Sequence, residues 1–220
     1  MLFHRFKNVI PSYEDFVKDL ETGDIILYQT SFWYSRLIEY FTKCPYSHIS
    51  IVLKNPIWLA EDLTEDYYLL ESGGEVFPDA VSGQYRFGVQ IAPLRRVYEQ
   101  YAHQNYGHLY LRKLKSDLSM ETLREKIKDA YGLLKDKPYD IHPLDWIKSY
   151  CDLDKSLDEI KGEKRTDCFW CSALVSFVYC QCGFLSKNIS WTIIAPSDYC
   201  YLNHRLLFQN CCLADDSRLI

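Results

Sequence analysis

The stretch from Arg165 to Cys180, RTDCFWCSALVSFVYC, leads from charged residues into a long apolar run. Two cysteines, Cys168 and Cys171, stand three positions apart where the charges stop. Such a pair fits several chemistries: metal ligands, a redox couple, half of a disulfide, or a nucleophile beside a packing residue. The choice depends on what the rest of the chain supplies, above all a histidine and a carboxylate.

Composition and charge narrow the class of protein. The chain has 220 residues, 48% hydrophobic and 15% aromatic, which is enough apolar material for a single domain spanning 1–220. The net charge of −5 argues against a general nucleic-acid binder, because such binding needs a basic surface. The N-terminus lacks a secretion-signal pattern, and nine cysteines without regular spacing argue against a disulfide framework. We therefore expect a cytoplasmic, reducing location.

The charge-free run from Cys168 to Ser186 is long enough to be considered as a membrane span. It carries Ser172, Ser176 and Gln181, however, which suit a helix enclosed by protein better than one surrounded by lipid. We therefore expect a buried helix over 168–182 and no membrane span, with peripheral lipid contact left open.

The remaining pattern predicts an α+β fold, with strands in the first half of the chain and helices in the second. Ser119 precedes an amphipathic stretch to Leu134, so a helix is expected there. A shorter helix is expected from Ser12 to about Leu20. Expected strands are 23–29, 47–55, 66–72, 88–94, 107–114 and 205–210; helices are also expected at 31–43 and after the turn at 137–140, and 152–164 is interpreted as a surface excursion.

Three interpretations of the cysteines compete with a nucleophile. A structural zinc site needs a second close pair of ligands, and neither Cys180-Gln-Cys182 nor Cys211-Cys212 has the usual gap. A thioredoxin-type couple normally follows a strand, whereas the charged loop EKRTD precedes this pair. In the third interpretation the cysteines are small hydrophobic residues of a buried helix, which we adopt for Cys168, Cys180 and Cys182.

Cys171 differs from the other thiols by its position. If Asp167 is the N-cap of the helix, Cys171 falls in the first turn, where backbone N–H groups and the helix dipole favour a thiolate. A thiolate at a helix start beside an imidazolium is the nucleophile of papain-type chemistry. That chemistry needs a histidine, held by a polar group, from elsewhere in the chain.

Among six histidines, His48 alone opens an apolar strand, HISIVL, directly after a turn that contains a proline. A histidine fixed at a strand edge can reach a cleft, although a lone strand histidine is more often a satisfied structural residue. Glu71 ends the strand DYYLLE before Gly73-Gly74, where it could orient an imidazole or be a solvated cap. Both alternatives stay open at this level.

Five segments together resemble the circularly permuted papain-like cysteine hydrolases: TGDIILYQ, PYSHISIVL, LLESGGEV, KPYD and WCSALVSFVY. This NlpC-related group includes bacterial YiiX-like proteins, relatives of lecithin retinol acyltransferase, and poxvirus and giant-virus proteins. In this group the histidine and acid strands precede the cysteine helix, which is the order His48, Glu71, Cys171 of this chain. The resemblance covers about 21–198, and the tail after Asp198 has no assigned counterpart.

The resemblance implies a permuted papain-like fold, in which an antiparallel sheet packs against helices and the nucleophile lies at a helix N-terminus. It also implies a Cys-His-Glu triad that acts without a cofactor or a metal. In that triad Cys171 is the nucleophile, His48 the general base, and Glu71 the group that orients the imidazole.

The resemblance also suggests residues around the triad. One candidate oxyanion donor is the backbone N–H of Cys171. Another is Tyr28 or Gln29 at the end of the first strand; for these two side chains, core packing is the alternative. Trp170 is a candidate wall of an acyl pocket or, equally, a core residue. Tyr139 is expected to be structural, with substrate contact as the lesser option.

The expected activity is hydrolysis or acyl transfer at an amide, ester or thioester bond through an acyl-enzyme intermediate. The substrate would be a peptide, an amide or a lipid acyl group. A different class is a non-enzymatic binding or virion-associated protein that keeps the fold, located in the virion if the chain is viral. A zinc-stabilised interaction module is the third class.

Overall fold

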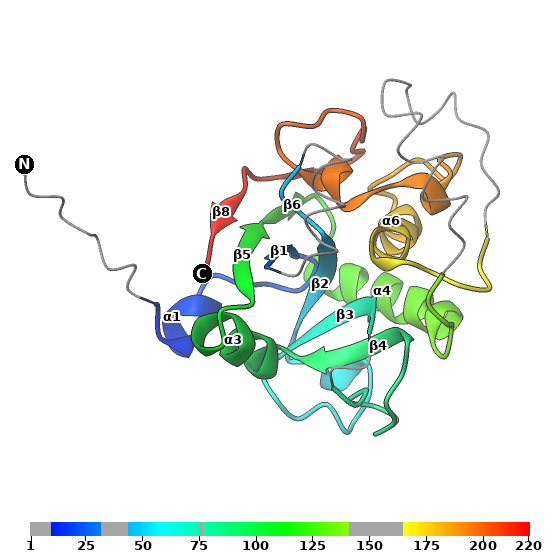
Figure 1. Ribbon diagram of the computed structural model, residues 1–220. Coiled ribbons are helices and arrows are strands. Elements are labelled where there is room, and N and C mark those ends of the chain that lie inside the picture. The colour runs from blue at the N-terminus through cyan, green and yellow to red at the C-terminus, as the bar shows by residue number, and fades with distance from the viewer. Residues whose placement is uncertain (1–9, 32–43, 75–76, 141–164) are drawn as a thin grey trace, which may run out of the picture.

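The computed structural model describes residues 10–31, 44–74, 77–140 and 165–220. At its centre, six strands form an antiparallel sheet in the order β4-β3-β2-β1-β5-β8, which confirms the expected α+β class (Figure 1). The strands of this sheet are β1 (Ile25–Thr30), β2 (His48–Lys54), β3 (Tyr67–Gly73), β4 (Gly88–Pro93), β5 (Gly107–Arg112) and β8 (Ser217–Arg218).

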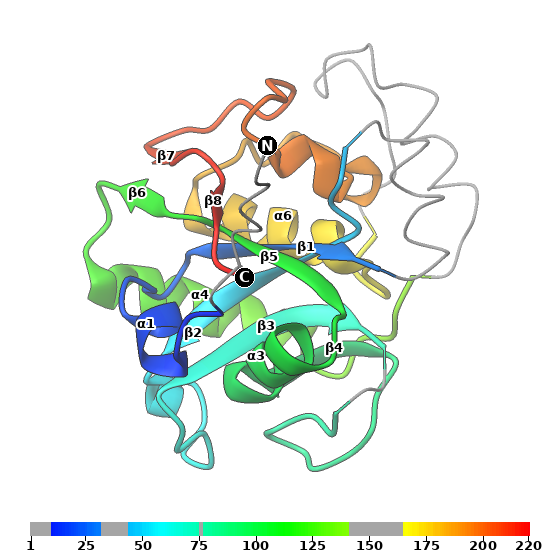
Figure 2. The same ribbon diagram turned by 60° about the vertical axis from the view of Figure 1, so that its left-hand side comes forward.

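Helices cover both faces of this sheet. Helices α1 (Tyr13–Val17) and α3 (Leu94–His103) lie on one face, and α4 (Met120–Leu134) and α6 (Cys171–Cys182) lie on the other (Figures 1 and 2). The apolar side chains divide accordingly into two clusters, one between the sheet and α4 and α6, the other between the sheet and α1 and α3. Along β2, for example, Ile51 belongs to the first cluster and its neighbour Val52 to the second.

Helix α6 is buried along almost its whole length because α4 and strands β2 and β3 surround it. Its polar groups find protein partners: Ser172 Oγ donates to the Ile194 carbonyl at 2.5 Å, and the Tyr179 hydroxyl donates to the Gly23 carbonyl at 2.9 Å. In the part of the chain that the structure describes, no helix is long and apolar enough to cross a membrane. The charge-free run is thus a core helix.

The amphipathic helix α4 matches the range expected from the sequence. Ser119 is its N-cap and accepts from the Thr122 N–H at 3.2 Å, while Leu123, Ile127 and Leu134 are buried toward α6. Ser12 likewise caps α1, although α1 ends at Val17 rather than Leu20. Both starts follow from a serine side chain that satisfies a free N–H group at the first turn.

Two expectations about the elements are wrong, and one helix was missed. Helix α6 begins at Cys171 with Trp170 as N-cap, so Asp167 is not the cap; its exposed carboxylate pairs with Arg165 at 3.3 Å. Helix α3 was not anticipated. The strand expected at 205–210 is absent from the described chain, which forms β7 (Cys211–Leu213) instead. The expected elements at 31–43 and 141–164 lie outside the described residues, apart from residue 31.

The C-terminal tail is tied into the fold. Strand β7 pairs with β6 (Leu114–Ser116), and β8 pairs with β5. The buried Arg112 guanidinium donates to the carbonyls of Tyr199 at 2.6 Å and Ala214 at 2.7 Å, and it pairs with Asp216 at 3.2 Å. These contacts make the residues after Asp198 an integral part of the sheet edge.

Candidate active site

His48 and Glu71 come together because their strands are antiparallel neighbours. His48 is the first residue of β2, and Glu71 lies near the end of β3. The His48 Nε2 atom lies 2.9 Å from Glu71 Oε2, and the two side chains are 22% and 11% exposed. The strand histidine therefore has the carboxylate partner that the sequence left open.

Gly73 lies beside this pair. Continuing the β2–β3 register places Gly73 opposite His48, so the imidazole reaches diagonally to Glu71 on the same sheet face. A Cβ atom on Gly73 would lie 3.5 Å from His48 Cε1 and 3.7 Å from Glu71 Oε1. The imidazole thus lies against the β3 backbone.

Cys171 approaches this pair from the other side. It is the first residue of α6, is 5% exposed, and belongs to the core cluster on the α6 face. Cys171 lies close enough to His48 to be, with Glu71, one of the two neighbours that raise the pKa of His48. Because Nε2 is directed at Glu71, Nδ1 is the ring nitrogen that remains for a second partner. The three residues singled out from the sequence therefore lie near one another, at the start of β2, the end of β3 and the start of α6.

The charges of the pair reinforce each other. Burial opposes a charge on His48, but the neighbouring Cys171 and Glu71 outweigh it and raise the pKa of His48 to about 10. Burial likewise raises the pKa of Glu71, but the hydrogen bonds and charge of its partners outweigh this, and the net shift of the Glu71 pKa is downward. An imidazolium facing a carboxylate is the favoured state at neutral pH.

Gln90 is a site residue that the sequence analysis missed. It lies on β4 directly opposite Glu71 in the β3–β4 register. Its Nε2 atom donates to Glu71 Oε1 at 2.9 Å, and its side chain is deeply buried. Within the strand GVQIAP a lone glutamine gives no functional signal; only the register places it beside the carboxylate.

Tyr28 lies behind the imidazole. It is opposite His48 in the β1–β2 register, and its hydroxyl is 3.0 Å from Ser50 Oγ. Burial and the charge of Glu71 raise the pKa of Tyr28 well above its ordinary value, so the phenol stays neutral. These contacts favour the packing alternative for Tyr28 over an oxyanion role for its hydroxyl.

The other three candidates have structural contacts. Gln29 Oε1 accepts from the Tyr110 hydroxyl at 3.2 Å, and Trp170 is buried in the α6-side core. Tyr139 packs on Phe87 with ring centroids 4.7 Å apart. A substrate role for Gln29, Trp170 or Tyr139 stays a prediction.

The segment before α6 is anchored by backbone pairing. The Phe169 N–H donates to the Pro138 carbonyl at 3.0 Å, and the Phe169 carbonyl accepts from Ser72 Oγ and from the Asp140 N–H. This pairing keeps residue 169 extended, which is why the helix cannot begin before Cys171. It also holds the helix start against the end of β3, next to Glu71.

The remaining described thiols have weaker claims to reactivity. Burial raises the pKa of Cys168 to about 11, and burial raises the pKa of both Cys182 and Cys211 to about 12. The pKa of Cys200 falls to about 7 because Cys44 hydrogen-bonds it. Cys200 has a thiol and the Asp216 carboxylate beside it, however, and neither can serve as an imidazole base.

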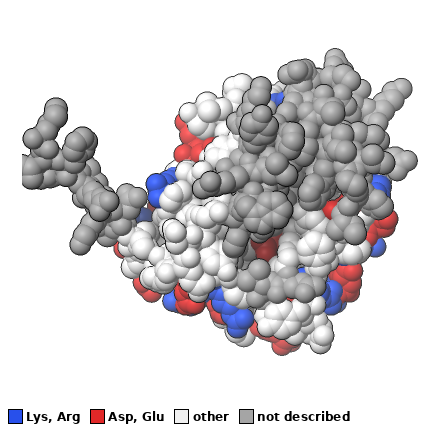
Figure 3. All heavy atoms as spheres, in the orientation of Figure 1, with Lys and Arg blue, Asp and Glu red and all other residues white. Residues whose placement is uncertain are grey.

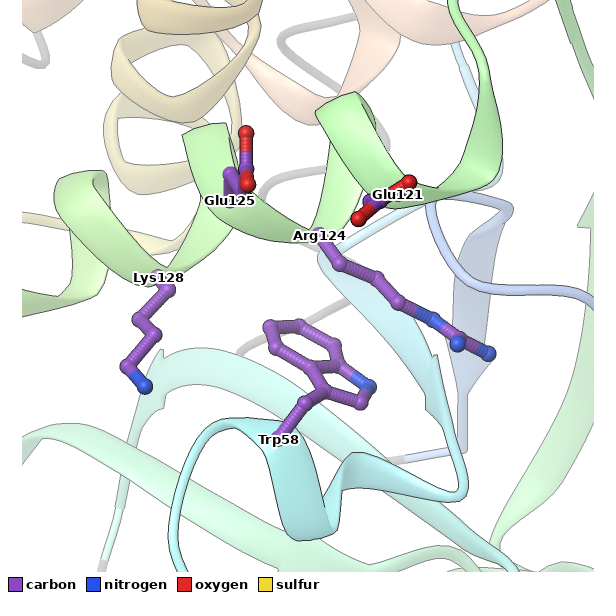
Figure 4. Close-up of a pocket in the computed structure, with 5 residues that line it drawn as sticks. All are labelled: Trp58, Glu121, Arg124, Glu125 and Lys128. Carbon is purple, nitrogen blue, oxygen red and sulfur yellow. The ribbon is translucent and has the colours of Figure 1, made fainter.

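Metal binding and cavities were also considered across the described residues. No group of three or more His, Cys, Asp and Glu side chains in these ranges could hold a metal ion. A surface hollow of about 430 Å³ lies away from the triad, between the 3-10 helix η1 (Pro56–Trp58) and α4 (Figure 4). The hollow is lined by Trp58, two basic side chains and two acidic ones: Arg124, Lys128, Glu121 and Glu125. This mixture of charges does not indicate a particular class of ligand.

In Figure 3, basic and acidic side chains lie next to one another along the lower and right edges of the described surface, and atoms of other residues cover much of the remaining face. This distribution agrees with the mildly acidic net charge of −5.

Comparison with known proteins adds little to this geometry. No protein-family model matches the chain, and no curated protein is a significant match to its sequence. One similar solved structure is the metalloprotein YiiX of Escherichia coli O157:H7, with 21% sequence identity and a TM-score of 0.45. The match covers 73% of this chain and 64% of that chain, so this chain spans less than two thirds of the neighbour's length. The functional interpretation therefore rests on the site itself.

Proposed function

We propose that this protein is a cysteine-dependent hydrolase or acyltransferase of the permuted papain-like type. The observation that supports this most is the His48 imidazole, which lies 2.9 Å from the Glu71 carboxylate and has the Cys171 thiol, at the start of α6, close enough to raise its pKa. A nucleophile, a base and an acid that orients the base are the set of groups that acyl transfer through a thioester needs.

In the proposed reaction the Cys171 sulfur attacks the acyl carbon of an amide, ester or thioester. The carbonyl electrons move to oxygen and return as the bond to the leaving group breaks, and protonated His48 gives its proton to that group. The product is a thioester on Cys171. His48 then takes a proton from water or another acceptor as that acceptor attacks the thioester carbon. The C–S bond breaks, which releases the acyl product and returns the Cys171 thiolate beside protonated His48.

The start of α6 is suited to stabilise the oxyanion. The Leu174 N–H makes the first bond of the helix, to the Trp170 carbonyl at 3.1 Å. The Cys171 N–H therefore has no partner within the helix and is available to the carbonyl oxygen of a substrate. The substrate would be a peptide, an amide or a lipid acyl group, and a reducing compartment such as the cytoplasm would keep the thiol free.

Alkylation kinetics test the nucleophile without a known substrate. Wild type, Cys171→Ala and the matched exposed-site control Cys212→Ala are treated with iodoacetamide at pH 6 and mapped by peptide mass. Cys171 should be modified first in wild type and in Cys212→Ala. If Cys168, Cys200 or Cys211 reacts faster, the nucleophile assignment is wrong.

Substrate profiling then tests the activity. A panel of amides, esters and thioesters is offered to wild type and to Cys171→Ser, with folding checked by circular dichroism. Turnover of some member of the panel should fall to near background in Cys171→Ser, because the hydroxyl is far less ionised than a thiol. Equal turnover by the two folded proteins contradicts the proposal.

A further inference from the structure

A second buried hydrogen bond holds the carboxylate of the triad. Glu71 Oε2 faces His48, while Glu71 Oε1 accepts from Gln90 Nε2, each at 2.9 Å. Gln90 is only 2% exposed and lies directly across the β3–β4 ladder from Glu71. The two carboxylate oxygens are therefore divided between a base and a neutral amide.

The orientation of the amide is set by its acceptors. Gln90 Nε2 lies 2.9 Å from Glu71 Oε1 and 3.4 Å from the Gly74 carbonyl, and both of these atoms accept hydrogen bonds. Turning the amide over would place its oxygen against two oxygens. Within the described residues, the Gln90 Oε1 atom is buried without a hydrogen-bond partner. Leaving a buried acceptor unpaired is unfavourable for stability, so this amide is not the residue that fold stability alone would select.

A neutral donor serves this position better than a second cation. Burial raises the pKa of Glu71 and so opposes its charge; the His48 and Gln90 hydrogen bonds both favour the ionised form. A lysine or arginine opposite Glu71 would compete with His48 for the carboxylate. An amide supports the negative charge and also limits rotation of the carboxylate, because it binds the oxygen that His48 does not use.

We propose that Gln90 is a positioning residue of the triad, which holds the Glu71 carboxylate ionised and turned toward His48. This inference rests on the proposed function. Gln90 itself does not contact the thiol in this scheme; it acts through Glu71 on the protonation and direction of the imidazole. Its removal should weaken the triad at low pH first, where Glu71 is nearest to accepting a proton.

The test is the pH dependence of Cys171 alkylation by iodoacetamide in Gln90→Met. Methionine has a similar length and donates no hydrogen bond. We expect Cys171 alkylation at pH 6 to slow about tenfold relative to wild type, as expected for loss of a hydrogen bond to a charged group. The acid limb of the rate profile should move to higher pH. The matched control Gln84→Met, at an exposed glutamine, should leave the profile unchanged.

A double substitution separates positioning from a general packing defect. If Gln90 acts through the carboxylate, Gln90→Met should have little further effect in a Glu71→Gln background. An effect of equal size with and without the Glu71 carboxylate would overturn the proposal. The proposal would also be overturned if the pH profile of Cys171 alkylation in Gln90→Met matched that of wild type.

Two further outcomes are distinguished by the same experiment. If Gln90→Met does not fold, Gln90→Glu is the second variant, because it keeps the shape of the side chain and places a second carboxylate opposite Glu71. This variant should move the acid limb of the Cys171 alkylation profile to still higher pH. An acid limb at the wild-type pH would refute the role of Gln90. If wild-type Cys171 reacts no faster than in His48→Ala, the proposed function itself fails. A His48-dependent rate that is insensitive to both Gln90 variants refutes only the present inference.

Discussion

The rings of Tyr28 and His48 meet edge to face, with centroids 4.8 Å apart and planes at 67°. The Tyr28 hydroxyl lies 3.0 Å from Ser50 Oγ, within hydrogen-bond distance, and Tyr28 and Ser50 are both buried. An aromatic edge against an imidazole restricts its tilt, and the hydroxyl in turn anchors the phenol ring. The contact assigns Tyr28 a supporting position behind the His48 imidazole.

Two substitutions at Tyr28 separate support from oxyanion stabilisation. Tyr28→Phe keeps the ring against His48, so we expect less than about a tenfold loss in kcat/KM or in the Cys171 alkylation rate. Removing the hydroxyl of an oxyanion donor would instead lower kcat/KM about a hundredfold or more. Tyr28→Leu, which removes the aromatic edge, should be the more damaging change. A Tyr28→Phe protein as inactive as Tyr28→Leu would return the hydroxyl to the list of oxyanion donors.

His48→Ala and Glu71→Gln should differ in severity. In the proposed mechanism the imidazole handles both proton transfers, and such catalysis typically contributes about a hundredfold to ten-thousandfold. Glu71→Gln keeps a side chain that can still accept a hydrogen bond from His48 but removes the negative charge. The loss of turnover in Glu71→Gln should therefore be smaller than in His48→Ala. Turnover of the best substrate found, compared at one pH in both variants, gives the ranking. Wild-type turnover by His48→Ala would rule out the triad.

Gly107 tests the packing of the sheet that carries the site. Its φ is +134°, and a Cβ atom there would lie 1.9 Å from the Gln29 carbonyl oxygen. Gly107→Ala must push β5 away from β1, so the free energy of unfolding should fall by about 1–3 kcal/mol or more. The control is Gly132→Ala on the exposed face of α4, where a Cβ atom meets nothing within 4 Å. Because alanine favours a helix interior, this control should gain up to about 1 kcal/mol.

Urea denaturation monitored by circular dichroism measures both glycine variants. The two changes add the same methyl group, so they differ in the backbone conformation of the position and in what surrounds the methyl group. Equal midpoints for Gly107→Ala and wild type would contradict the close approach of β1 and β5.

The helices that could be recognised from the sequence share a local signal. Ser119 and the apolar spacing up to Leu134 predicted α4, and the uncharged run around Val175 predicted a buried helix. His48 and Glu71 stood at the ends of apolar strands, but their local context left a structural role open. They were singled out by the resemblance of five segments, which lie far apart in the chain, to a known family.

The residues that were missed depend on pairing between distant segments. Gln90 acquires its meaning from its position opposite Glu71, and the start of α6 depends on the bonds of Phe169 to Pro138 and Ser72. No window of sequence contains these partners. Helix α3 is a different case: Leu94, Val97, Tyr98 and Tyr101 follow a helical spacing that was present and was overlooked.

The last prediction concerns the pH dependence of stability. The pKa of His48 is about 10 in the folded protein and 6.5 ordinarily, so between these values the folded chain holds a proton that the unfolded chain has lost. The stabilisation from His48 is therefore complete below pH 6.5 and is lost as the pH rises through about 10. The shift at Glu71 has the opposite sign: its contribution is present above pH 4.5 and is lost at lower pH.

The wild-type advantage over His48→Gln in free energy of unfolding should thus be largest near pH 5.5, smaller at pH 7.5 and smallest at pH 9.5. His108→Gln is the control, because burial and Arg218 lower the pKa of His108 and its contribution cannot decline with pH in this way. An advantage over His48→Gln that stays constant or grows from pH 5.5 to 9.5 would show that His48 carries no proton beyond its ordinary range.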